Sequence, residues 1–77
     1  MPVLAYLFVE CAPRRSRGVL ARLKRIPGIQ DADVVIGPYD IIAVVEAVDQ
    51  ATIVADILRK VEEIPGVKRN TMNLVVR

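Results

Sequence analysis

The chain has 77 residues, a formal net charge of +2, one cysteine (Cys11) and no histidine. A single domain of this size, residues 1–77, has a core that barely offsets the entropy lost on folding, so metals, disulfides or oligomerisation usually help. A lone cysteine cannot form an internal disulfide, and a metal site without histidine or further cysteines lacks its usual ligands. We therefore expect no metal, no cofactor, and stabilisation by oligomerisation.

Targeting and membrane signals are also missing from the sequence. No apolar stretch approaches the roughly 20 residues that a membrane-spanning helix needs. Met1-Pro2 leads straight into a strand-like segment without a charged leader. We expect a cytoplasmic protein without a membrane partner. The small positive charge suggests a polyanionic partner.

Hydrophobic periodicity predicts six secondary-structure elements. In chain order they are a strand (3–10), a helix (13–25), two strands (31–36 and 41–48), a helix (50–63) and a strand (69–76). The strand segments are rich in β-branched and aromatic residues, and the helical segments carry apolar residues three or four positions apart. Asp49 is the predicted N-cap of the second helix.

The tripeptide Ile-Pro-Gly occurs twice, at 26–28 and 64–66, each time after a predicted helix. A residue before proline is disfavoured in the α region, and the glycine tolerates the positive φ that commonly follows a helix. The chain therefore consists of two similar strand-helix-strand units. Together they predict a ferredoxin-like α+β fold, β-α-β-β-α-β.

Right-handed crossovers order the predicted antiparallel sheet as 69–76, 3–10, 41–48, 31–36, with both helices on one face. An antiparallel sheet that faces water on its other side should alternate apolar and polar residues, but both central strands are apolar on both faces. A second copy of the chain, packed sheet to sheet in a dimeric α+β barrel, is the simplest cover. The predicted dimer interface comprises Leu4, Tyr6, Phe8, Ile42 and Val44.

The segment Gly37-Pro38-Tyr39-Asp40 lies between two apolar runs and is typical of a tight turn. In one interpretation Gly37 relieves crowding, Tyr39 covers the end of the sheet and Asp40 accepts a hydrogen bond from a backbone amide. In the other, the turn lies at the rim of an assembly, where Asp40 binds the ammonium group of a small zwitterion and loop amides bind its carboxylate.

From Val3 to Val76 this arrangement resembles the effector (RAM) domain of the Lrp/AsnC regulators, in a stand-alone form without the helix-turn-helix. The resemblance implies amino-acid binding where dimers meet in a ring, and association with full-length regulators. It also implies a regulatory role in the transcription of amino-acid metabolism. By this resemblance the ligand-binding residues are Gly37, Tyr39 and Asp40 from the hairpin, with Asn70 and Met72 at the positions where the family commonly has Thr-x-Thr.

Six basic residues and no acid lie between Cys11 and Gln30. A solvated helix face, acidic neighbours on the second helix (Asp56, Glu62 and Glu63) or nucleic-acid phosphates are the possible explanations. The aromatic residues belong to the apolar sheet rather than to a base-stacking platform, which argues against binding of single strands. Without a DNA-binding element of its own, the domain is expected not to bind DNA directly.

Two further function classes stay open from the sequence. One is a structural or protein-interaction module that oligomerises without a ligand. The other is a cofactor-free dimeric barrel enzyme, in which Asp40 or buried Asp33 or Glu46 would do the acid-base work. Those acids have no partner in the sequence that would tune them, and we predict that the protein has no catalytic residue and is not an enzyme.

Overall fold

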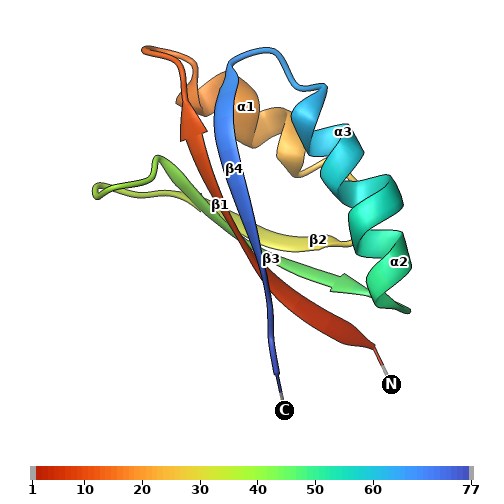
Figure 1. The fold of residues 1–77 in the computed structure, drawn as a ribbon. Helices are drawn as coiled ribbons and strands as arrows, with labels where there is room; N and C mark the ends of the chain where they lie inside the picture. The colour runs from red at the N-terminus through yellow and green to blue at the C-terminus, as the bar shows by residue number, and fades with distance from the viewer. Residues whose placement is uncertain (1, 77) are drawn as a thin grey trace.

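The computed structural model describes residues 2–76 and shows a four-stranded sheet with helices on one side (Figure 1). The elements are β1 (Val3–Cys11), α1 (Ser16–Leu23), β2 (Ile29–Val34), β3 (Ile41–Ala47), a second helix and β4 (Val67–Leu74). The second helix comprises α2 (Gln50–Thr52), the π-helical turn η1 (Ile53–Ile57) and α3 (Leu58–Glu62). No helix within residues 2–76 is both long and apolar enough to cross a membrane.

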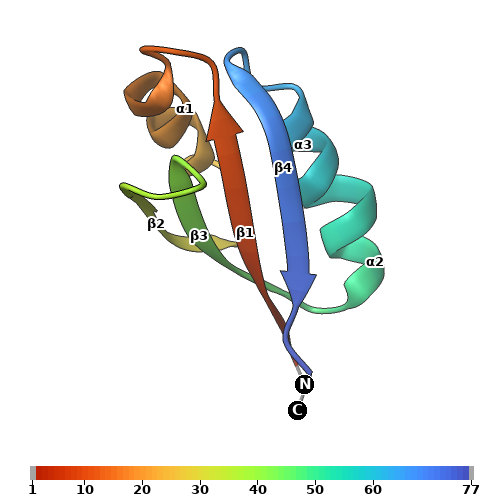
Figure 2. The same cartoon turned by 60° about the vertical axis from the view of Figure 1, so that its left-hand side comes forward.

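The sheet has the order β2-β3-β1-β4, and every neighbouring pair is antiparallel (Figure 2). This confirms the predicted ferredoxin-like topology, with the strands of the two halves interleaved and β1 and β3 in the centre. In the β1–β3 pair, Leu7 lies opposite Ala43 and Phe8 opposite Ile42. Since directly opposed residues share a face, the register assigns each side chain to the helix side or the open side.

The core lies between the helices and one face of the sheet. From β1 and β3 it contains residues that alternate along each strand: Ala5, Leu7, Val9, Ile41, Ala43 and Val45. Val19 and Leu23 from α1 and Ile53, Ile57 and Val61 from the second helix pack on them, all at most 1% exposed. Every second residue of the strands and every third or fourth residue of the helices therefore pack together in one apolar layer.

A side-chain cap fixes the start of the second helix, and a backbone conformation fixes the start of the first. Asp49 caps the second helix as predicted: its Oδ1 accepts hydrogen bonds from the Thr52 amide at 2.8 Å and the Thr52 hydroxyl at 2.6 Å. These bonds, the one from the hydroxyl first, lower the pKa of the Asp49 carboxyl. The first helix begins at Ser16, three residues later than predicted, because Arg14 has a φ of 68° and cannot lie in a right-handed helix.

Both Ile-Pro-Gly segments end a helix, as predicted. Gly28 and Gly66 have φ angles of 104° and 99°, a region that favours glycine. The outer strands then begin two residues earlier than predicted, because Ile29 and Val67 already pair with β3 and β1. Register shifts next to both residues accommodate the tight turn before the regular ladder starts.

Candidate functional site

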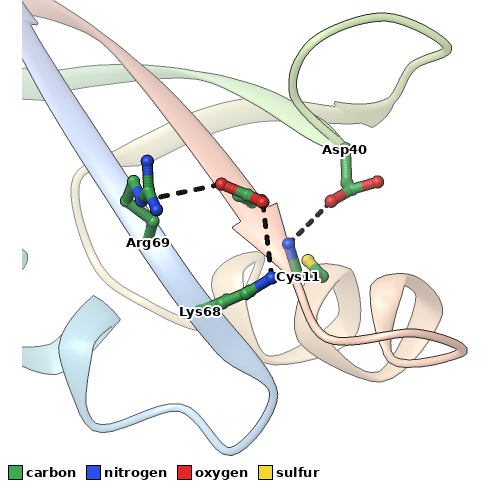
Figure 3. A network of polar contacts seen from close by, with 5 residues as sticks. Cys11, Asp40, Lys68 and Arg69 are labelled. Carbon is green, nitrogen blue, oxygen red and sulfur yellow. Dashed lines mark hydrogen bonds and ion pairs between the residues drawn. The ribbon is translucent and has the colours of Figure 1, made fainter.

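The β2–β3 hairpin is fastened to the end of the central strand β1. The Val35 amide donates to the Asp40 carbonyl at 2.8 Å and closes the loop. The Asp40 amide donates to the Val9 carbonyl at 2.9 Å, and the Cys11 amide donates to Oδ2 of Asp40 at 2.7 Å (Figure 3). Asp40 therefore accepts a bond from a backbone amide, as the turn interpretation predicts, and its carboxylate has a fixed position.

Only one oxygen of the Asp40 carboxylate, Oδ2, accepts a hydrogen bond from within residues 2–76. Within residues 2–76, Oδ1 of Asp40 accepts no hydrogen bond, and the residue is half-buried. In Figure 3 the carboxylate lies between the hairpin and the arrow end of β1, with one oxygen directed at Cys11 and the other away from it. The geometry leaves one charged acceptor for a donor from outside the chain.

Tyr39 connects the hairpin to the open face of the sheet. Its ring packs against Phe8 with 5.0 Å between the centroids and 36° between the planes. Phe8 is one of the five predicted interface residues, so the hairpin and the open face form one continuous surface. A partner that covers the sheet also comes close to Asp40.

Gly37 lies at the exposed tip of the hairpin and has no structural need to be glycine within one chain. A Cβ atom added there would meet nothing within 4 Å, and its φ lies outside the left-handed region. The expectation that Gly37 relieves crowding within the chain is therefore wrong. The absence of a side chain leaves the loop backbone accessible from outside.

The two predicted site residues of β4 lie on the helix side of the sheet. Asn70 is opposite Val9 and Met72 is opposite Leu7, and both β1 residues are fully buried under the helices. Met72 packs against the core, and Asn70 is half-buried. The structure thus brings Asn70 and the Asp40 backbone to the same end of β1, on opposite sides of that strand, and places Met72 further inside.

The open face of the sheet carries the five predicted interface residues. Tyr6 is 47% and Ile42 37% exposed, while Leu4, Phe8 and Val44 are half-buried by their neighbours. Because much of this surface is already covered within the chain, association would gain about 1 kcal/mol for each residue, rather than the roughly 1.5 to 3 kcal/mol of a fully exposed side chain.

A hollow of about 270 Å³ opens on this face beside the edge strand. Tyr6, Ile42 and Val44 line it together with Asp31, Asp33 and Val35. Asp31 and Val35 were not predicted to belong to this surface, although the alternation along 31–35 places them on the same face as Asp33. At the opposite edge, Glu10 pairs with Lys68 and Arg69 at 3.8 and 3.7 Å (Figure 3).

Catalysis through buried acids finds no support in this arrangement. Asp33 and Glu46, which the enzyme interpretation takes as buried acids, are both exposed. Asp40 is the half-buried acid of the hairpin, and its bonded oxygen holds a backbone amide.

The pKa of the Cys11 thiol depends on the charge of Asp40. Burial first, and the nearby Asp40 carboxylate second, raise the pKa of the Cys11 thiol, whereas a hydrogen bond from Ser16 lowers it. We expect Asp40→Asn to lower the thiol pKa, because it removes the negative charge and keeps an oxygen for the Cys11 amide. Ser16→Ala is the control and should raise the pKa. A pH titration of the thiolate ultraviolet absorbance measures both, and an unchanged pKa in Asp40→Asn would contradict the geometry described here.

Comparison with known proteins identifies the family. A family model described as the Lrp/AsnC ligand binding domain matches residues 4–77. A comparison with curated protein sequences finds no significant match.

Solved structures share the fold. TTHA0845 from Thermus thermophilus has a TM-score of 0.91 and 21% identity over 97% of this chain and 94% of its own. E. coli AsnC has a TM-score of 0.89 and 16% identity over 97% of this chain and 51% of its own. The transcriptional regulator NMB0573 from Neisseria meningitidis, solved with L-Met, has a TM-score of 0.76 and 18% identity over 97% and 50%. This chain therefore spans about half the length of the latter two.

The family match covers nearly the whole chain, and the structure has the sheet order and the paired turns after the helices that the sequence predicted and on which the resemblance rests. The neighbours include regulators of transcription. The chain belongs to the Lrp/AsnC family, whose ligand-binding domain it matches over residues 4–77.

Proposed function

We propose that this protein is an amino-acid-responsive regulatory domain whose effector binds at the β2–β3 hairpin of an assembled dimer. The observation that carries the proposal is the Asp40 carboxylate, which is fixed through one oxygen at 2.7 Å from the Cys11 amide and offers the other outward. A fixed, half-buried carboxylate suits the ammonium group common to all amino acids. The domain would act in the cytoplasm by changing its assembly in response to this effector.

A homodimer through the open face would complete this site. Two helices cover one face of the sheet, and the other presents Leu4, Tyr6, Phe8, Ile42 and Val44. A second copy supplies an apolar surface of the same shape and covers both faces at once. Because Tyr39 stacks on Phe8, this dimer would hold the hairpin at its rim, where a further dimer of a ring can enclose the ligand.

The glycine at the hairpin tip supports a ligand role. Since Gly37 meets no constraint inside the chain, its small size is explained by close approach of something outside it. Loop amides near Gly37 would then bind the effector carboxylate while Asp40 binds its ammonium group. Asn70 would add a donor and acceptor from the other side of β1, and Met72 would support that strand from the core side.

The class of effector is supported by a relative. NMB0573, which shares the fold, is a transcriptional regulator solved as a complex with L-Met. We propose a free amino acid as the effector of this chain, and full-length Lrp/AsnC regulators as its partners in mixed assemblies. In the alternative, an oligomerisation module without a ligand, the Asp40 carboxylate would serve only to fix the turn through the Cys11 amide.

Isothermal titration calorimetry of the dimer against each standard amino acid tests the proposal. We expect one or a few to bind, and Asp40→Asn to weaken binding about 10- to 100-fold, because a charge-assisted hydrogen bond contributes about 1.5 to 3 kcal/mol. Asparagine keeps the oxygen that accepts from Cys11, so the loop should stay in place. Ser16→Ala, close to Cys11 but outside the site, is the matched control and should bind as the wild type does. Absence of binding by the wild type would leave the module without a ligand as the function.

A further inference from the structure

The segment around α1 carries charge of a single sign. Six basic residues and no acidic residue lie between Cys11 and Gln30, and all six are exposed. We refer to them as the α1 basic surface: Arg14, Arg15, Arg17, Arg22, Lys24 and Arg25. Helix dipoles favour the three at the C-terminal end, but the first helical turn has no acidic residue to balance the three at the N-terminal end.

The chain does not neutralise this surface. Within residues 2–76, the ion pairs join Lys60 to Asp56 at 3.5 Å and join Lys68 and Arg69 to Glu10. None involves the α1 basic surface. The idea that acidic residues of the second helix pair with it is therefore not supported by the contacts.

One carboxylate lies near the C-terminal end of the surface. Glu63 shares a hollow of about 280 Å³ with Arg22, Arg25 and Lys60, without an ion pair to the two arginines. Three cations and one anion line this hollow, and Lys60 also pairs with Asp56, so the local balance stays at one positive charge. A polyanion supplied from outside the chain is the complement to such a surface.

Gly18 adds an independent observation. It lies inside α1, where glycine costs stability relative to alanine. A Cβ atom there would meet nothing within 4 Å, and its φ lies outside the left-handed region, so neither packing nor backbone conformation requires glycine. Gly18 shares a helical face with Arg22, four positions later, and with the small residue Ala21, while Arg25 follows the end of the helix. This face lets a partner approach the helix closely between basic side chains.

The chemistry of the surface favours nucleic acid over an acidic protein. Protein interfaces have an apolar centre, whereas nucleic-acid interfaces are more polar and much more positive. The exposed large apolar residues of the described chain all lie outside 12–30: Tyr6, Val34, Ile36, Ile42, Val48, Val54, Leu74 and Val76. Five of the six cations are arginines, whose planar guanidinium groups bind phosphate through two hydrogen bonds.

We propose that the α1 basic surface binds the phosphate backbone of duplex DNA without reading its sequence. This revises the expectation of no direct DNA binding. The argument from the aromatic residues of the sheet concerned single strands only. Tyr6 and Phe8 lie on the open face, away from α1, and phosphate contacts need no base stacking. In a sheet-to-sheet dimer both α1 surfaces face outward, so each dimer offers two. The inference does not depend on the effector site at Asp40.

Fluorescence anisotropy with a short labelled duplex of arbitrary sequence tests the proposal. We expect the wild type to bind with a Kd on the order of 10⁻⁵ M and to lose affinity steeply between about 50 and 200 mM salt. Arg17→Gln/Arg25→Gln should weaken binding about tenfold and reduce the slope of log K against log salt by about one for each phosphate that is no longer neutralised. Arg59→Gln/Lys68→Gln removes the same charge outside α1 and should bind nearly as the wild type does.

A further variant, Gly18→Leu, tests whether DNA must approach α1 closely, without changing the charge of the α1 basic surface. Gly18→Leu keeps every cation and favours the helix, so it should melt no lower than the wild type but bind the duplex several-fold more weakly. Three outcomes would overturn the proposal: no salt-dependent binding at low salt, equal losses in the two charge variants, or tighter binding of poly-glutamate than of DNA through the same arginines. The last would assign α1 to an acidic protein. Thermal melting of each variant shows that it is folded.

Discussion

Tyr6→Glu is expected to dissociate the proposed sheet-to-sheet dimer into folded monomers. Tyr6 is 47% exposed at the centre of the open face, so one chain alone tolerates a charge there. In a sheet-to-sheet dimer the two-fold axis brings two such carboxylates into an apolar interface, where each unpaired charge costs about 3 to 5 kcal/mol. The dimer dissociation constant should rise at least about a thousandfold. Sedimentation velocity at micromolar concentration measures the change.

Val54→Glu is the matched control for this experiment. Val54 is an exposed apolar residue of similar accessibility, 54%, but it lies on η1 in the helix layer, outside the open face. We expect this variant to remain dimeric. A wild type that sediments as a folded monomer, or a Tyr6→Glu variant that stays dimeric, would exclude the open face as the interface. It would also remove the rim on which the proposed effector site depends.

Gly28→Ala is expected to destabilise the fold by about 2 to 3 kcal/mol, since an L-residue in the left-handed region and overpacking each cost about 1 to 2 kcal/mol. Gly28 has a φ of 104°, and a Cβ there would lie 2.6 Å from Cδ1 of Ile57 and 3.1 Å from the Glu46 carbonyl oxygen. Ile57 is 1% exposed and has little room to move. For a domain of this size the loss corresponds to a fall in melting temperature of about 10 to 20 °C.

Gly37→Ala provides the comparison within the same chain. Its φ lies outside the left-handed region and the added methyl group meets nothing within 4 Å, so the melting temperature should hardly change. If the hairpin tip contacts the effector, this variant should still weaken amino-acid binding in calorimetry. A large loss of stability in Gly37→Ala, or none in Gly28→Ala, would contradict the backbone conformations described here.

The Gly28 and Gly37 variants test the folding of a single chain, whereas the Tyr6 and Val54 variants test the association of two chains. Gly28 belongs to the turn that ends α1 and returns the chain to the sheet, and its carbonyl accepts from the Glu46 amide at 2.8 Å. Its replacement acts on the folding of one chain. Tyr6 has no such role, and its replacement acts only where two chains meet. If the Gly28 and Tyr6 variants both behave as expected, one chain folds by itself and two chains associate through the open face.

The candidate site was predictable in part. The acid, the aromatic residue and the glycine of the hairpin were recognisable because they interrupt two apolar runs. The partner of Asp40 was not, because Cys11 is distant in sequence and contributes its backbone amide, which nearly every residue carries. The face on which Asn70 and Met72 lie depends on the pairing of β4 with β1, and a shift of one residue would reverse it.

The order of elements, the turns at Gly28 and Gly66 that follow the two helices, and the apolar residues of the core could be predicted from the sequence. These features follow from local rules, namely hydrophobic period, proline geometry and the freedom of glycine at positive φ. Contacts between distant segments determine which oxygen of Asp40 accepts a hydrogen bond and how far neighbours already cover the open face. They also leave the basic residues of α1 without an ion pair within residues 2–76. Those properties depend on distances between segments remote in the chain, and such distances are set when strands pair and helices pack.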